Sequence, residues 1–181
     1  NLFYSKDGHC ISSPNDIADS FNEFFSTIGS DLANQIKYVN KTFDSFMSKP
    51  VFQSMDIAPT NPFEIIKLAG DLKASHSCGY DDIDPSIAKS SINCIAPLLS
   101  SIINCSLETG VFPTDLKMAK VIPLFKSGEK NKVLNYRPIS VLPYFSKFFE
   151  KVMYNRLYNH FNELSLFSSG VFAVHECAAV S

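Results

Sequence analysis

Apolar residues recur at steps of three and four along much of the chain, and this spacing is typical of helices with one buried face. Three of the periodic stretches open with a proline preceded by a serine, asparagine or aspartate, residues favoured at the start of a helix. Asn61 is expected to cap its helix together with Glu64 in a capping box. The pattern predicts helices over about 14–37, 61–73, 85–93 and 97–108, and a long helix after Pro143.

Two short runs of β-branched and aromatic residues break this helical pattern. They span Ala119–Phe125 and Tyr136–Leu142, and a charged loop containing Gly128 joins them. We expect two antiparallel strands, with an edge or irregular character because Pro123 and Pro138 cannot donate a ladder hydrogen bond. The predicted fold class is therefore α+β, predominantly helical, with a short two-stranded antiparallel hairpin.

The composition is that of a folded chain with one domain, or one domain and a helical extension. Hydrophobic residues make up 45% of the 181 residues and charged residues 19%, which excludes wholesale disorder. No apolar run reaches membrane-spanning length, and the first twenty residues carry several charges where a signal peptide would be apolar. We expect an intracellular protein, cytoplasmic or nuclear, with no membrane partner.

Several kinds of chemistry find no support in the residues. The five cysteines are odd in number and form no Cys-x-x-Cys pair, so free thiols are expected rather than disulfides or zinc. The four histidines are dispersed, with no nucleophile motif beside them. The adjacent Asp81 and Asp82 suggest a magnesium site, but the capping Asp84 and Pro85 that follow indicate a loop entering a helix. We expect no catalytic residue and no metal site in this chain.

The charges are sorted along the chain, although the net charge is only −2. Residues 1–116 sum to −7, whereas residues 117–156 sum to +7. Lys120, Lys126, Lys130, Lys132 and Arg137 lie on or between the two predicted strands, so a hairpin could gather several of them toward phosphates of a nucleic acid or a nucleotide. The alternative is a solvated lysine-rich turn.

Four segments in the same order resemble the fingers region of reverse transcriptases from non-LTR retrotransposons of the jockey-like type. They are GVFP at 110–113, KMAKVIPLFKSG at 117–128, NYRPISVLP at 135–143 and FFEKV at 148–152. Residues 63–85 are similar to the segment that precedes the fingers, and residues 17–29 more weakly to the connector from the endonuclease part. The resemblance implies a partial fingers subdomain of a right-hand polymerase fold. It divides the chain into a helical connector and linker over 1–58, a fingers-like region over 59–167 and a divergent tail over 168–181.

The resemblance also implies roles for four cations. Lys126 and Arg137 stand where the family binds the triphosphate of the incoming nucleotide, and Lys120 and Lys130 are suggested as template or backbone contacts. The implied partners are an RNA or DNA template-primer and a deoxynucleotide, and the implied cofactor is magnesium in the parent enzyme.

The sequence departs from the family near its end. After LFSSG at 166–170 the family continues with a QFGFR stretch, where this chain has VFAV. We expect a fragment that lacks the catalytic palm, is inactive alone and retains binding through the basic hairpin. The alternatives are a helical protein-interaction module that self-associates to cover the surface left by the palm, and the product of a decayed element without function.

Overall fold

The computed structural model describes residues 2–37, 41, 42, 45, 54–73 and 77–165. The predicted tail at 168–181 lies outside these residues, as does most of the predicted linker. The chain divides into two compact units, each built from two separate stretches. Unit 1 comprises Asn1–Phe52 and Lys120–Val141, and unit 2 comprises Gln53–Ala119 and Leu142–Ser181.

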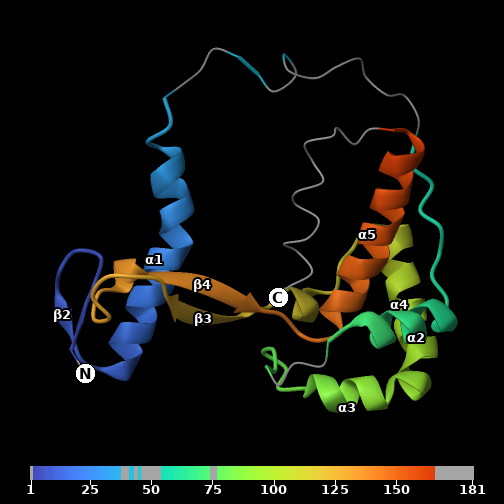
Figure 1. Ribbon diagram of the computed structural model, residues 1–181, viewed down its shortest axis with the longest axis horizontal. Coiled ribbons are helices and arrows are strands. Elements are labelled where there is room, and N and C mark those ends of the chain that lie inside the picture. The colour runs from blue at the N-terminus through green and yellow to red at the C-terminus, as the bar shows by residue number, and fades with distance from the viewer. Residues whose placement is uncertain (1, 38–40, 43–44, 46–53, 74–76, 166–181) are drawn as a thin grey trace. The chain divides into compact units, whose positions relative to one another are not determined.

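In its described residues, unit 1 contains the α-helix α1, a short 3-10 helix and two small antiparallel sheets (Figure 1). Strands β1 (Phe3–Tyr4) and β2 (Cys10–Ile11) form a hairpin that precedes helix α1 (Pro14–Ala33). Strands β3 (Lys120–Phe125) and β4 (Tyr136–Val141) form the second hairpin, joined by a loop that contains the short 3-10 helix η3 (Val133–Asn135). The predicted basic hairpin is thus confirmed, within one residue at each strand boundary.

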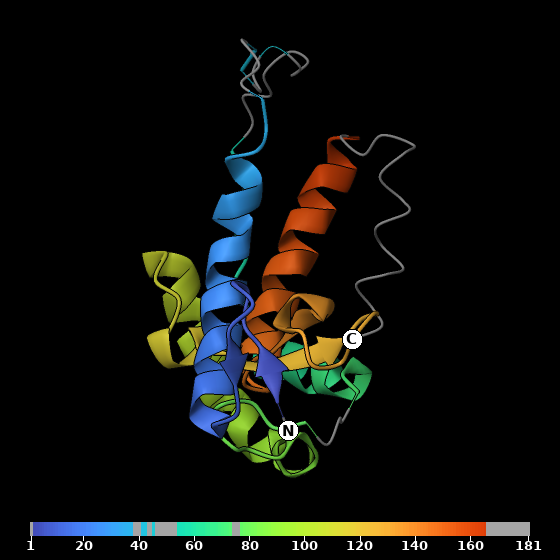
Figure 2. The same ribbon diagram turned by 90° about the vertical axis from the view of Figure 1, so that its left-hand side faces the viewer.

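The core of unit 1 is aromatic and includes both stretches of its sequence. Phe21 and Phe24 on α1 are buried, and Val133 of η3 is fully buried against them. Phe3 and Tyr136 pack on the edge of this cluster, and Figure 2 shows α1 and the β1–β2 hairpin together in unit 1. Helix α1 ends four residues before the predicted Lys37, and Leu32 and Ile36 near its end are exposed.

Unit 2 is helical. Its elements are α2 (Pro62–Asp71), α3 (Pro85–Ser90), α4 (Ile92–Thr109), the 3-10 helix η2 (Thr114–Lys117) and α5 (Ser146–Glu163). Side chains from α2, α3, α4 and α5 share one apolar core, in which Ile65, Ala96, Ile103, Phe148 and Val152 are fully buried. Of the helices in the described residues, none has the length and apolar composition that crossing a membrane requires.

The helix ends of unit 2 follow local chemistry closely. Asn61 accepts a hydrogen bond from the Glu64 backbone N–H at 3.0 Å, and Asp84 accepts one from Ser86 at 2.7 Å, as predicted for caps. Gly110 ends α4 in the left-handed region, with φ of 69°. The capping box is only half formed, because the Glu64 carboxylate binds Thr60 and Arg156 instead.

The predicted start of the fourth helix at Pro97 is wrong. Helix α4 begins at Ile92, so Pro97 lies inside it. Proline removes one backbone hydrogen bond there. Burial compensates for this loss, because Ile92 and Ala96, which precede the proline, pack into the core of unit 2.

A tight backbone contact fixes the turn that leads to α3. A Cβ added to Gly79 would lie 2.7 Å from the backbone N of Pro143 and 2.9 Å from the carbonyl carbon of Leu142. Such distances are below any normal van der Waals separation, so only glycine fits at this position. The turn therefore lies directly on the backbone that connects β4 with α5.

Candidate nucleic-acid interface

The β3–β4 hairpin presents two faces of different character. Leu124 pairs with Arg137, and Phe125 pairs with Tyr136. Since directly opposed residues share a face and successive residues alternate, Phe125 and Tyr136 lie on one face and Leu124 and Arg137 on the other. The face of Phe125 and Tyr136 contacts α1, because the Tyr136 ring packs edge-on against Phe21 with centroids 5.1 Å apart.

The second face carries cations and exposed apolar side chains. Lys120, Ile122 and Leu124 of β3 alternate onto it, together with Arg137 and Ile139 of β4. All five are exposed to solvent. We call this surface the outer face of the hairpin.

Lys126 extends the outer face by one step beyond β3. Its backbone N–H donates to the Asn135 carbonyl at 2.8 Å, which continues the ladder past the Phe125–Tyr136 pair. Lys126 therefore alternates onto the same face as Leu124, diagonal to Arg137, with a Cβ separation of about 7 Å. Both side chains are exposed. The register thus places the two predicted triphosphate-binding residues side by side.

The other two predicted cations stand apart from this pair. Lys120 lies on the outer face at the far end of β3, about 20 Å from Lys126 at the usual rise per residue of a strand. The Lys130 ammonium lies 5.8 Å from the centroid of the Phe125 ring, a ring on the face that contacts α1. The arrangement therefore separates Lys130 from the Lys126 and Arg137 pair.

The loop between the strands is ordered by its own polar contacts. Lys132 forms an ion pair with Glu129 at 2.7 Å, and the Asn135 side-chain amide donates to the Glu129 carbonyl at 2.9 Å. Gly128 adopts φ of 87°, and a Cβ there would lie 2.8 Å from the Asn135 Nδ2. The Tyr136 hydroxyl donates to the Lys130 carbonyl at 2.7 Å. These bonds hold the loop in one conformation beside Lys126.

The N-terminal hairpin also supports the loop, and the sequence analysis missed it. The Tyr4 backbone N–H donates to the Asn131 carbonyl at 2.7 Å. The available signal was Asp7-Gly8 between two apolar pairs, a strong hairpin dipeptide, and Gly8 has φ of 83°.

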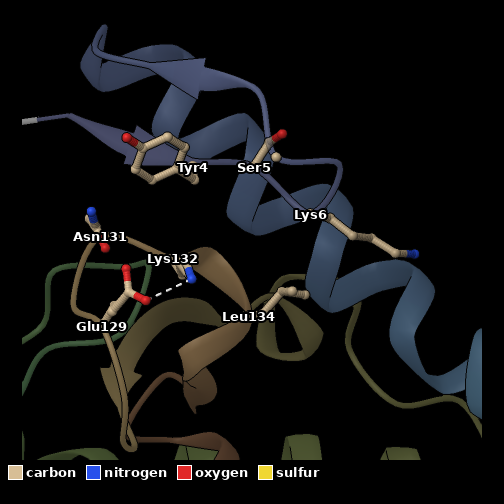
Figure 3. Close-up of a pocket in the computed structure, with 8 residues that line it drawn as sticks. Tyr4, Ser5, Lys6, Glu129, Asn131, Lys132 and Leu134 are labelled. Atoms are coloured by element: carbon tan, nitrogen blue, oxygen red, sulfur yellow. Dashed lines mark hydrogen bonds and ion pairs between the residues drawn. The ribbon is translucent and has the colours of Figure 1, made fainter.

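A pocket of about 490 Å³ lies between the β1–β2 turn and the basic loop (Figure 3). Lys6, Tyr4 and Ser5 line it from one side, and Asn131, Lys132 and Glu129 from the other. Lys6 pairs with Asp31 of α1, whose carboxylate raises the pKa of the lysine, and Lys132 pairs with Glu129. Both lysines of this pocket are thus paired with carboxylates. Among the described residues, no such ion pair is found for Lys126 or Arg137.

The adjacent Asp81 and Asp82 lie in the turn that leads into α3. The Asp81 Oδ1 accepts the Ile83 backbone N–H at 3.3 Å, and the turn leads into the Asp84 cap as predicted. Among the described residues, no group of three or more histidines, cysteines, aspartates or glutamates gathers in metal-binding geometry.

Comparison of sequences relates the chain to known proteins. No protein-family model matches the chain. It is 34% identical over 97 residues to the putative 115 kDa protein in type-1 retrotransposable element R1DM of Drosophila melanogaster, covering 52% of this chain and 10% of that protein. It is 31% identical over 118 residues to the probable RNA-directed DNA polymerase from transposon BS of the same species, covering 65% of this chain and 13% of the relative.

A third relative is the RNA-directed DNA polymerase from mobile element jockey of D. melanogaster, 28% identical over 115 residues, covering 63% of this chain and 13% of the relative. These matches confirm the resemblance drawn from the motifs. The chain is a homologue of proteins from non-LTR mobile elements, two of which, jockey's among them, are named as RNA-directed DNA polymerases. It spans only about a tenth of the length of these relatives.

Proposed function

We propose that this chain is part of an RNA-directed DNA polymerase of a non-LTR retrotransposon, and that the β3–β4 hairpin belongs to its fingers. Lys126 and Arg137 bind the triphosphate of the incoming deoxynucleotide. The observation that supports this role is their diagonal placement on the exposed outer face. The names of two relatives support the activity of the whole polymerase.

The two cations suit a triphosphate for different reasons. A guanidinium donates two parallel hydrogen bonds to phosphate oxygens, whereas an ammonium acts as a compact point charge. A spacing of about 7 Å lets both contact one triphosphate. The opposite face is packed on α1 through Tyr136, which holds Arg137 in place by fixing its strand.

Lys120 and Lys130 are assigned to the nucleic acid. Lys120 lies too far along β3 to share a triphosphate with Lys126, so it is expected to contact the template or primer backbone. Lys130 stands beside Phe125 and is expected to contact the backbone from the loop. Magnesium, which the family uses for transfer, is assigned to no residue in the described part of the chain.

Binding of a fluorescent deoxynucleotide triphosphate to the 181-residue protein tests the proposal. Lys126→Ala and Arg137→Ala are each expected to weaken binding by about tenfold or more, equivalent to about 1.4 kcal/mol. Lys132→Ala is the charge-matched control, because it removes a lysine of the same loop that is paired with Glu129, and binding should change by less than about twofold.

Three outcomes would decide the matter. Loss of binding in the two variants but not in the control supports the triphosphate site. Equal loss in all three indicates a general effect of charge on the loop and contradicts the assignment. Affinity unchanged in Lys126→Ala and Arg137→Ala at both low and moderate salt means that the outer face is a solvated lysine-rich surface.

A further inference from the structure

Helix α4 presents an uncharged side to solvent. Cys94, Leu98, Ser101 and Cys105 follow each other at steps of four, three and four, so they lie along one side of the helix. All four are exposed. We call this line the α4 stripe. The opposite side of α4 packs into the core of unit 2.

The α4 stripe is apolar for a surface that faces water. Leu98 near its centre keeps 65% of its surface exposed, and Ile102 beside it keeps 42%. Both cysteines are free, and a thiol packs like a small apolar side chain. The Ser101 hydroxyl donates to the Pro97 carbonyl at 3.0 Å. Covering the α4 stripe would therefore leave no hydroxyl donor unsatisfied.

The two ends of α4 lack the charges that stabilise a helix. The N-terminal end of a helix carries partial positive charge and the C-terminal end partial negative charge. Ser91 forms no side-chain capping hydrogen bond at the N-terminal end, and the first turn contains no acidic residue. The last turn contains no basic residue but includes Glu108, which is exposed. Within the described part of the chain, Glu108 forms no ion pair.

We propose that the α4 stripe binds the α4 stripe of a second copy of this chain, with the two helices antiparallel. Glu108 lies three residues beyond Cys105, on the same side of α4. Antiparallel pairing puts each Glu108 beside the N-terminal turn of the other helix, where a carboxylate is stabilised. The surface is thus complementary to itself, which is the property of an interface with two-fold symmetry.

The spacing of the α4 stripe defines one register for this pair. The stripe has a cysteine at each end, with Leu98 and Ser101 between them. When the helices run antiparallel, each Cys94 faces Cys105 of the second copy and each Leu98 faces Ser101 of the second copy. The same register brings each Glu108 to the first turn of the other helix. A large side chain opposite a small one allows helix axes to approach to about 8–10 Å.

The absence of charge along the α4 stripe favours this partner over a nucleic acid. A phosphate backbone is bound through lysine and arginine side chains, and the stripe has none. The inference stands on unit 2 and does not depend on the triphosphate site of unit 1. Variants of the α4 stripe should change association and leave deoxynucleotide triphosphate binding unchanged, whereas variants of Lys126 and Arg137 should do the reverse.

Covalent capture tests the register. The protein for this test is the 181-residue chain with Cys10→Ser, Cys78→Ser and Cys177→Ser, which leaves Cys94 and Cys105 as its thiols. An ethylene-bridged bismaleimide adds one thiol across the double bond of each maleimide. Within one chain the two cysteines lie about 16 Å apart along α4, beyond the reach of this reagent. A cross-linked dimer in denaturing electrophoresis therefore reports contact between copies.

Removal of one further cysteine separates antiparallel from other pairings. A protein that retains only Cys94, and one that retains only Cys105, should each give little cross-linked dimer. An equal mixture of the two proteins should restore it, because Cys94 of one copy meets Cys105 of the other. Cross-linking of each protein alone, as strong as in the mixture, would indicate parallel pairing or random collision and would contradict the inference.

Analytical ultracentrifugation of the 181-residue protein measures the strength of association. Leu98→Glu puts a carboxylate of each copy inside the contact and should weaken association at least about tenfold. Ile87→Glu is the matched control, because Ile87 of α3 is 66% exposed in the same unit and lies outside the α4 stripe. Its association should stay within about twofold of that of the unaltered chain.

Glu108→Gln tests the charge at the ends of the pair. It should weaken association about fivefold, because each copy loses one favourable contact with a helix N-terminus. Circular dichroism melting of each variant shows that unit 2 is folded. Glu108→Gln alters an exposed side chain, so it keeps the test decisive if Leu98→Glu melts early.

Two further results would overturn the inference. One is a chain that stays monomeric at every protein concentration and gives no cross-linked dimer. The other is a dimer whose association is unchanged in both Leu98→Glu and Glu108→Gln, which would show that the copies meet through another surface.

Discussion

At the scale of single residues, the hydroxyl of Tyr144 stands out. Tyr144 is 1% exposed in the core of unit 2, where its ring contacts the rings of Phe145 and Phe148 edge-on. Among the described residues, its hydroxyl has no hydrogen-bond partner. Burial raises the pKa of this hydroxyl, because the phenolate would lose its hydration. A buried polar group without a partner costs stability.

Tyr144→Phe is therefore expected to stabilise the protein by about 1 kcal/mol at neutral pH. Because the pKa of Tyr144 is raised above its ordinary value of 10.0 in the folded protein, the unfolded chain loses this proton first, and the stability of the fold falls as the pH rises above 10. The variant should accordingly lose less stability than the unaltered chain between pH 10 and 11. Urea unfolding followed by circular dichroism measures both effects.

Tyr80→Phe is the matched control, because its hydroxyl lies on an exposed side chain, and its unfolding free energy should change by less than about 0.5 kcal/mol. A Tyr144→Phe protein that is less stable than the original would show that the hydroxyl has a partner.

At the scale of secondary-structure elements, a polar cluster ties α5 to the start of α2. The Arg156 guanidinium binds Glu64 through two nitrogens and also donates to the carbonyls of Ala58 and Pro59. The Thr60 hydroxyl donates to Glu64 at 2.8 Å, and the Asn104 amide bonds the Thr60 backbone in both directions. Three helices thus meet at one short extended segment.

Glu64→Gln is expected to destabilise unit 2 by about 2 kcal/mol at neutral pH, because the guanidinium keeps its burial but loses its counter-charge. The hydrogen bonds from Arg156 lower the pKa of Glu64 below its usual value. This stabilisation is therefore present above about pH 4.5 and is lost as the pH falls through the lowered pKa.

The measurement is urea unfolding at pH 7 and pH 3. The difference between the unaltered chain and Glu64→Gln should shrink at pH 3. Lys117→Ala, which removes an exposed lysine of η2 in the same unit, serves as the control and should behave like the unaltered chain at both values. A gap between the two proteins that stays constant with pH would contradict the role of the carboxylate charge.

The same elements show what the sequence could and could not predict. Prolines 14, 62 and 85 marked helix starts correctly, because each follows a residue suited to cap a helix. Pro97 follows Ala96, which is not a capping residue, and the predicted helix start there failed, since burial of Ile92 and Ala96 compensates for the lost hydrogen bond inside α4. The pairing of Arg156 with Glu64 could not be predicted, because the two residues lie 92 positions apart, beyond any local pattern.

Some features of the candidate interface could also be predicted from the sequence, and others could not. The composition of the strands predicted the hairpin, and the motif order suggested Lys126 and Arg137. Which cations share a face depends on the register, which the sequence leaves open. The contact of Lys130 with Phe125 depends on the loop conformation, which the bonds of Asn135 and Tyr136 define.

At the scale of the whole molecule, unit 1 is built from two stretches that are far apart in the sequence. The N-terminal stretch supplies Phe3, Phe21 and Phe24, and the distant hairpin supplies Val133 and Tyr136 to the same cluster. Two strands alone are marginal in water and need an apolar surface to pack on. The order of the hairpin therefore depends on residues about a hundred positions earlier.

Removal of residues 1–37 is expected to abolish amide protection in the β3–β4 hairpin while the helices of unit 2 keep theirs. The reason is that Val133 and Tyr136 lose the partners that bury them, whereas the core of unit 2 contains no residue of the deleted stretch. Hydrogen exchange read by mass spectrometry measures both units in one experiment. Hairpin protection equal to that of the full chain would show that the hairpin folds without α1.

The close contact of Gly79 with the backbone at Leu142 and Pro143 limits which substitutions related sequences can accept at this position. A mobile element leaves many copies in a genome, and most substitutions in them are tolerated when they fall on an exposed surface. Position 79 has no such tolerance, because any side chain would collide with backbone atoms that cannot move aside. Among related copies, a retained glycine at this site should therefore mark those lineages in which the protein is still under selection to fold.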